Sequence, residues 1–170
     1  MTKVLTKACP ATNRFADLKP ADLNAEEKEM LIALAISILK ARHRRGQPLQ
    51  SPHTTRTYLQ LQCADYRNEV FGCLFLDTRN RVVEHAELFR GSIDSATVHP
   101  RVVVQRALEV NAAAIVVFHN HPSGVAEPSQ ADRALTRRLA DALGLVDIRL
   151  IDHLVIGESE SVSFAERGWL

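Results

Sequence analysis

The first apolar pattern along the chain has the spacing of a helix. Leu31, Leu34 and Ile38 recur every three or four residues and form one stripe. Asn24 and Glu27 precede this stripe with the three-residue separation of a capping box. We therefore expect a helix that begins at Asn24, preceded by a lead-in without periodicity.

A second, shorter helix is expected after a break in this pattern. Gly46 and Pro48 end the first helix, because glycine and proline both disfavour its continuation. The dipeptide Ser51-Pro52 is a start signal, and the segment TTRTYLQLQCA continues it. The first sixty or so residues thus predict a helical extension before the main domain.

The pattern then changes to that of strands alternating with helices. EVFGCLFLD and RVVEHAELF are typical of two strands joined by the turn DTRN, and AAAIVVFH and DIRLIDHLVIG predict two more. One intervening helix begins at His99-Pro100, and another begins at Ser129 and ends at Gly144. A capping-box spacing from Ser163 predicts a final short turn.

The order of these elements indicates the fold class. Two helices, two strands and then helix, strand, helix, strand favour an α/β fold, a mixed sheet flanked by helices, with an N-terminal helical extension. We expect residues 1–50 to form the lead-in and first helix and residues 51–170 to form the main domain.

Composition limits the binding partners and the cellular compartment that we expect. The chain has 21 basic and 20 acidic side chains, so no overall field holds nucleic acid, and tight nucleic-acid binding is not expected. No apolar run approaches the roughly 20 residues that cross a membrane. Cys9, Cys63 and Cys73 are odd in number and lack a C-x-x-C spacing, and no leader pattern opens the sequence. We expect a reduced, cytoplasmic protein.

Candidate chemistry is concentrated in residues 118–132, FHNHPSGVAEPSQAD, directly after a run of pure hydrocarbon. His119 and His121 are two apart on an extended segment, so both imidazoles can face one point. Asp132, in the first turn of the following helix, can reach the same point. Two imidazoles and one carboxylate suit Zn²⁺, whose catalytic sites leave a fourth position to water. We expect one zinc ion per chain.

Hydrolysis at such an ion needs a general base for the water and a hydrogen-bond donor for the oxyanion. The pKa of a bound water falls from about 15.7 toward roughly 7, and a second carboxylate must take its proton. The hairpin offers Glu69, Glu84 and Glu87 as candidates. Ser129, three residues before Asp132, could donate a hydrogen bond to the developing oxyanion.

The same residues also have a purely structural interpretation. Ser129 and Asp132 form a capping box by themselves, and an H-x-H pair is often just two neighbouring strand histidines. The conjunction of both at the end of a buried strand favours the metal site. Capping remains compatible with it, because a carboxylate is favoured near a helix N-terminus in either case.

The longer motifs resemble a known family. HNHPSGVAEPSQAD has the form H-x-H-x₇-S-x₂-D, which is similar at all four positions to the metal signature of the JAMM (MPN+) metalloproteases. The stretches EVFGCLFLD, ELFRGSID, HPRVVVQRAL, NAAAIVVFHNHPSG and LIDHLVIG resemble the RadC family, whose JAMM-like domain would cover about residues 51 to 170. The shortened form resembles RadC-like proteins of mobile elements.

This resemblance implies a JAMM/MPN-type α/β fold similar to cytidine deaminase, hydrolysis of an amide or isopeptide bond, and a zinc site. Its implied metal ligands are His119, His121 and Asp132. EVFGCLFL resembles the E-x-x-G stretch where JAMM enzymes place their base, which favours Glu69 and leaves Glu87 as the fallback.

His153, in IDHLVIG, also resembles a RadC family feature. We expect it to be a core or rim histidine hydrogen-bonded to a neighbour rather than a fourth ligand.

Three functional hypotheses follow. The favoured one is a zinc metallopeptidase that acts on a peptide or protein substrate. The second is a DNA-repair-associated or DNA-processing protein, suggested by the family name and by the basic segment KARHRRG. In the third, the metal is structural or lost, and the domain only binds a partner.

Overall fold

The structure is a computed structural model that describes residues 18–42, 51–91 and 98–170. Cys9, Gly46, Pro48 and the basic side chains of KARHRRG lie outside the described residues. The chain divides into two compact units, Met1–Ala35 and Ile36–Leu170, and each is considered by itself. The elements, in chain order, are η1 (Pro20–Asp22), α1 (Ala25–Arg42), α2 (Pro52–Cys63), β1 (Val70–Leu76), β2 (Val82–Arg90), α3 (Pro100–Glu109), β3 (Ala114–Asn120), α4 (Gln130–Gly144), β4 (Arg149–Ile156) and β5 (Ser161–Ser163).

The first two helices begin where the sequence predicts. Asn24 and Glu27 each accept a backbone hydrogen bond from the other at 2.9 Å, which confirms the capping box before α1. Ser51 caps α2 by accepting a backbone N–H from its first turn at 3.1 Å. The predicted apolar stripe of α1 is not buried, since Leu34 and Ile38 are about half exposed. No helix in the described ranges is long and apolar enough to cross a membrane.

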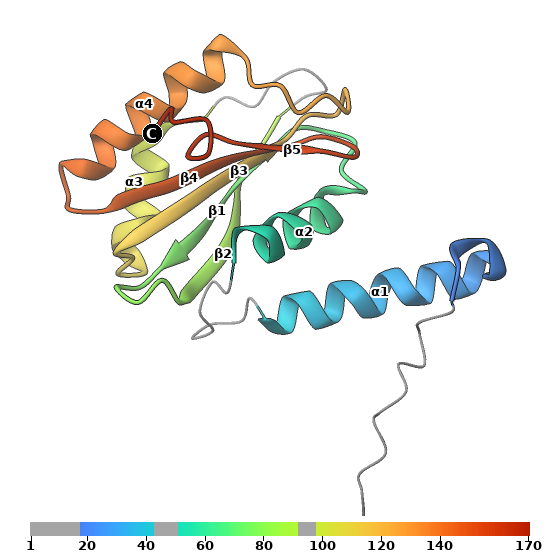
Figure 1. Ribbon diagram of the computed structural model, residues 1–170. Coiled ribbons are helices and arrows are strands. Elements are labelled where there is room, and N and C mark those ends of the chain that lie inside the picture. The colour runs from blue at the N-terminus through green and yellow to red at the C-terminus, as the bar shows by residue number, and fades with distance from the viewer. Residues whose placement is uncertain (1–17, 43–50, 92–97) are drawn as a thin grey trace, which may run out of the picture. The chain divides into compact units, whose positions relative to one another are not determined.

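The five strands form one mixed sheet in the order β2-β1-β3-β4-β5 (Figure 1). Only β3 and β4 pair in parallel, while β1 and β2 form the predicted antiparallel hairpin. This arrangement confirms the predicted α/β class. The 3₁₀ helix η1 and the short strand β5 were not predicted. The turn after β5 is capped as expected, because the N–H of Glu166 donates to the Ser163 hydroxyl at 3.1 Å.

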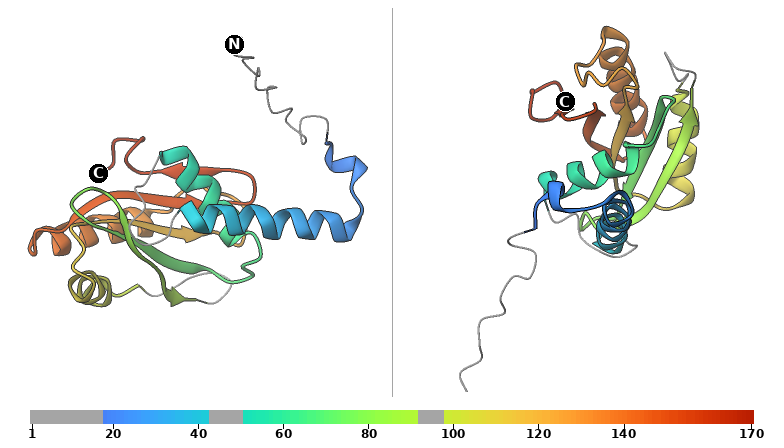
Figure 2. Two further views of the ribbon diagram at one scale, coloured as in Figure 1. Left: turned by 90° about the horizontal axis from the view of Figure 1, so that it is seen from below. Right: turned by 90° about the vertical axis from the view of Figure 1, so that its right-hand side faces the viewer.

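Helices cover both faces of the sheet, with α2 on one face and α3 and α4 on the other (Figure 2). Alternate residues of the central strand therefore enter different cores. Val116 and Phe118 of β3 pack on the α2 side, whereas Ile115 and Val117 pack on the side of α3 and α4. His119 continues the second set, so its side chain points to the face that α4 covers.

Gly72 of β1 lies against the side chain of Phe118. A Cβ atom at position 72 would come within 2.3 Å of the Phe118 ring and 3.0 Å of the Ala86 carbonyl oxygen. The glycine in the E-V-F-G stretch is therefore required by packing, since any side chain there would displace the ring.

Asn120 fixes the segment that enters β1. Its side chain is 4% exposed, and its carbonyl oxygen accepts the backbone N–H of Val70 at 2.8 Å. Its amide donates to the Asn68 carbonyl at 3.1 Å. The residue between these two contacts is Glu69, whose own carbonyl accepts the N–H of Gly91 at 2.8 Å. The backbone around Glu69 is thus held on both sides.

We expect Asn120→Ala to lower the free energy of unfolding by about 1–3 kcal/mol, because it leaves the buried N–H of Val70 without its acceptor. Urea denaturation measures this loss. Gln105→Ala removes an exposed amide from α3 and should change the stability by less than about 0.5 kcal/mol. Equal stability of the two variants would contradict the role of Asn120.

Candidate metal centre

His119 and His121 converge at the carboxyl end of β3. Their Nε2 atoms lie 2.9 Å apart, although Asn120 between them points to the opposite face. The His119 side chain is 1% exposed and that of His121 is 19% exposed. The pair therefore lies at the boundary between the core and the surface, with His121 on the side of the solvent.

Asp132 completes a group of three from the first turn of α4. Its Oδ1 lies 3.4 Å from Nε2 of His119, and its Oδ2 lies 3.8 Å from Nε2 of His121. Tetrahedral bonds of about 2.0–2.1 Å separate neighbouring ligand atoms by roughly 3.4 Å. The observed separations of 2.9 to 3.8 Å lie around this value, so the group could hold a metal ion.

The ring of His121 is oriented by the loop that follows it. Its Nδ1 lies 2.7 Å from the Val125 carbonyl oxygen, which can only accept a hydrogen bond. Nδ1 therefore carries the proton in the neutral ring, and Nε2 presents a lone pair toward His119 and Asp132.

Ser129 and Asp132 form the predicted capping box of α4. The N–H and the hydroxyl of Ser129 both donate to Oδ2 of Asp132, at 2.7 and 2.6 Å, and the Asp132 N–H donates back at 3.1 Å. The cap sets the direction of the carboxylate and leaves Oδ1 facing His119. In this arrangement the Ser129 hydroxyl proton is directed at Asp132.

His153 of β4 is fully buried and has hydrogen-bond partners at both ring nitrogens. Its Nε2 lies 2.8 Å from Nδ1 of His119, and its Nδ1 lies 2.6 Å from the hydroxyl of Thr136. This confirms the expectation of a core histidine bonded to a neighbour. Both ring nitrogens are thus engaged, one with the far side of the His119 ring and one with Thr136, so His153 is not placed as a fourth ligand.

Electrostatics keep this group ready to bind a cation. Burial lowers the pKa of His119 to about 4. The Asp132 carboxylate raises the pKa of His121, and the charge of Glu69 adds to this effect. Burial would raise the pKa of Asp132, but His121 and His119 together hold it well below its usual range. Near neutral pH the carboxylate is therefore an anion and the His119 ring is neutral.

Glu69 is the hairpin carboxylate that approaches the group. Phe71 of β1 pairs with His119 of β3 in the antiparallel register. Continued by two residues, this register places Glu69, just before β1, opposite His121, just after β3. Its charge acts on His121, which agrees with this placement.

Glu84 and Glu87 are engaged elsewhere. Glu84 accepts two hydrogen bonds from Arg106 of α3, at 2.8 and 2.7 Å. Glu87 bonds to Tyr66 and Arg90 and pairs with Gly72, on the face opposite His119. The structure does not bring either of them to the three-residue group.

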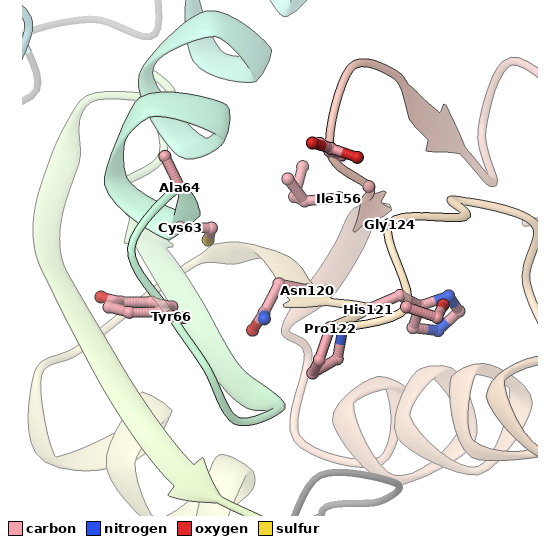
Figure 3. A pocket seen from close by; sticks show the side chains of 11 residues that line it. Cys63, Ala64, Tyr66, Asn120, His121, Pro122, Gly124 and Ile156 are labelled. Carbon is pink, nitrogen blue, oxygen red and sulfur yellow. The ribbon is translucent and has the colours of Figure 1, made fainter.

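A polar cavity of about 360 Å³ lies beside His121. Cys63 and Tyr66 at the end of α2 face Asn120, Pro122 and Ile156 across it (Figure 3). No sequence pattern indicates this cavity, because its walls come from three distant segments. The contacts of Asn120 and of His153 with Thr136 were also missed. No local pattern indicates the contact of His153, because four consecutive residues from His153 to Ile156 are buried.

Comparison with known proteins agrees with this geometry. The RadC-like JAB domain matches residues 49–169. A UPF0758 protein of Vibrio vulnificus (strain YJ016) is 60% identical over 126 residues, which are 74% of this chain and 56% of that protein. A UPF0758 protein of Ectopseudomonas mendocina (strain ymp) is 54% identical over 167 residues, which are 98% of this chain and 74% of that protein.

The chain thus spans little more than half the length of the Vibrio vulnificus relative. Its five-stranded mixed sheet with flanking helices is consistent with a JAB/MPN fold, as the motifs predict. The match across most of the chain and the high identity to these relatives confirm the resemblance. The chain therefore belongs to the family of proteins with a RadC-like JAB domain.

Proposed function

We propose that this chain is a zinc-dependent hydrolase of the JAMM metallopeptidase type, which cleaves a peptide or isopeptide bond. The observation that carries the proposal is the approach of two imidazole Nε2 atoms to 2.9 Å beside a carboxylate. The Val125 carbonyl directs the lone pair of His121 toward this point. Two facing lone pairs and an anion repel each other, and a bound cation removes that repulsion.

The donor set favours zinc over other common ions. Calcium and magnesium prefer oxygen ligands, whereas two nitrogens and one oxygen suit zinc. Three protein ligands also leave one tetrahedral position, as in catalytic rather than structural zinc sites. Zinc held by His119, His121 and Asp132 would lower the pKa of a bound water and polarise a substrate carbonyl.

The chain's own residues supply the remaining chemistry. Glu69 accepts a proton from the attacking water and returns it to the leaving amine, because the register of β1 on β3 places it opposite His121. The Ser129 hydroxyl turns from Asp132 toward the developing oxyanion. Asp132 then still accepts the backbone N–H of Ser129, so its carboxylate stays in place.

The proposed substrate is a peptide or protein chain. The wall of the cavity beside His121 includes the loop that follows this residue and several polar side chains. Such a wall suits an extended polypeptide rather than an apolar ligand. Family membership supports this substrate class.

The wild-type chain is expected to bind about one zinc ion, and Asp132→Asn or His121→Ala to weaken zinc binding by more than about 100-fold. The loss exceeds the 10–100-fold typical of outer hydrogen-bond partners because a direct ligand is removed. Metal analysis and competition with a chromophoric chelator measure it. His53→Ala, which removes an exposed histidine of α2, should bind zinc as the wild type does. Zinc binding that survives both ligand substitutions would refute the site.

For the base, Glu69→Gln should lower the rate of peptide-bond cleavage by about 10²–10⁴-fold with unchanged zinc content. Cleavage of a mixed pool of peptides and lysine-linked isopeptides is followed by mass spectrometry. The matched variant Glu87→Gln removes the other candidate charge and should retain most of the activity. If Glu87→Gln loses activity and Glu69→Gln keeps it, the assignment of the base is wrong.

A further inference from the structure

The hydroxyl of Thr136 links α4 to the buried histidine of β4. Its Oγ1 lies 2.6 Å from the Asp132 carbonyl oxygen and 2.6 Å from Nδ1 of His153. A carbonyl oxygen can only accept a hydrogen bond, so the single hydroxyl proton goes to Asp132. The contact with His153 must then be one in which Nδ1 of His153 donates.

The direction of the next hydrogen bond follows from this one. His153 is 0% exposed, and its two ring nitrogens contact His119 and Thr136 rather than a carboxylate, so the neutral ring is favoured. With its proton on Nδ1, its Nε2 accepts from Nδ1 of His119 at 2.8 Å. The proton of His119 is therefore on Nδ1, and its Nε2 is a lone pair facing His121.

We propose that His153 and Thr136 are positioning residues for the metal centre, and that their hydrogen bonds fix the tautomer in which His119 offers Nε2 to the ion. The proposal rests on the metal binding in the proposed function and extends it to two residues that touch no ion. The donor chain runs from His119 to His153, then to Thr136 and to the backbone of Asp132. It begins and ends at candidate ligands, so it couples β3 to α4 through β4.

Packing holds the central ring of this donor chain in one orientation. The Phe164 ring stacks on His153 with centroids 4.7 Å apart, and Phe71 meets its edge at 5.9 Å. The parallel register pairs His153 with Val117, two residues before His119. The ring therefore cannot turn without displacing neighbours that are themselves buried.

Loss of the Thr136 hydroxyl would leave the tautomer of His153 unfixed. Without the hydroxyl oxygen as acceptor for Nδ1, His153 can carry its proton on Nε2 and donate it to His119 instead. Nε2 of His119 then carries the proton and points it at His121, where it competes with a metal ion for the same space.

The test compares Thr136→Val, which keeps the shape of the side chain, with Thr136→Ser, which keeps the hydroxyl. In the full chain, competition with a chelator should show zinc affinity about 10–100-fold weaker for Thr136→Val and close to wild type for Thr136→Ser. The metal-free variants should unfold within a few degrees of each other, which separates positioning from a loss of fold. Equal zinc affinity in the two variants would overturn the proposal.

His153 gives an independent pair of variants. His153→Phe fits between the two phenylalanine rings but accepts no hydrogen bond, and it should weaken zinc binding at least as much as Thr136→Val does. His153→Gln supplies one acceptor and one donor and should recover part of the affinity. If His153→Gln binds zinc no more tightly than His153→Phe, the result counts against the donor chain.

A nitrogen-resolved NMR spectrum of the metal-free protein reports the tautomer of His119 directly. The Nδ1–H form is expected in the wild type and in Thr136→Ser, and a mixture is expected in Thr136→Val. A wild type that binds no zinc but shows this pattern would contradict the proposed function, although the control of the His119 tautomer by Thr136 would be confirmed. If the wild type binds zinc but all three proteins show the same tautomer mixture, the donor chain alone is contradicted.

Discussion

The parallel pairing of β3 with β4 is the constraint on which the rest of the molecule depends. Parallel neighbours cannot be joined by a tight turn, so the chain must leave the carboxyl end of β3, cross over as α4 and return. The crossover places the N-terminus of α4 beside the residues that end β3. Asp132 therefore meets His119 because of topology, and the capping box with Ser129 then sets the direction of its carboxylate.

The features that depend on neighbours in sequence were predictable. The apolar run AAAIVVFH predicted the central strand, and the caps at Asn24, Ser51 and Ser129 marked helix starts because capping is a local interaction. Alternation along a strand was enough to bring His119 and His121 together. The motif resemblance then indicated the family before any contact between distant segments was known.

Features that depend on distant pairing could not be read in this way. Strand β5 has three residues and exists because β4 offers it an edge, which no local pattern records. The choice between Glu69 and Glu87 depends on the register of β1 against both neighbours, since a shift of one residue exchanges the faces. One hydrogen bond of His153 joins it to Thr136, a residue seventeen positions away on another element.

The alternation within His-Asn-His gives this tripeptide two tasks on two sides of one sheet. Its histidines point toward Asp132 on one side of the sheet, while Asn120 secures the backbone that carries Glu69 from the other side. A mutational screen that scores only loss of function would therefore group Asn120 with the two histidines, although its side chain points to the opposite face. Separating architecture from chemistry in this motif requires structural and metal-content readouts for every inactive variant.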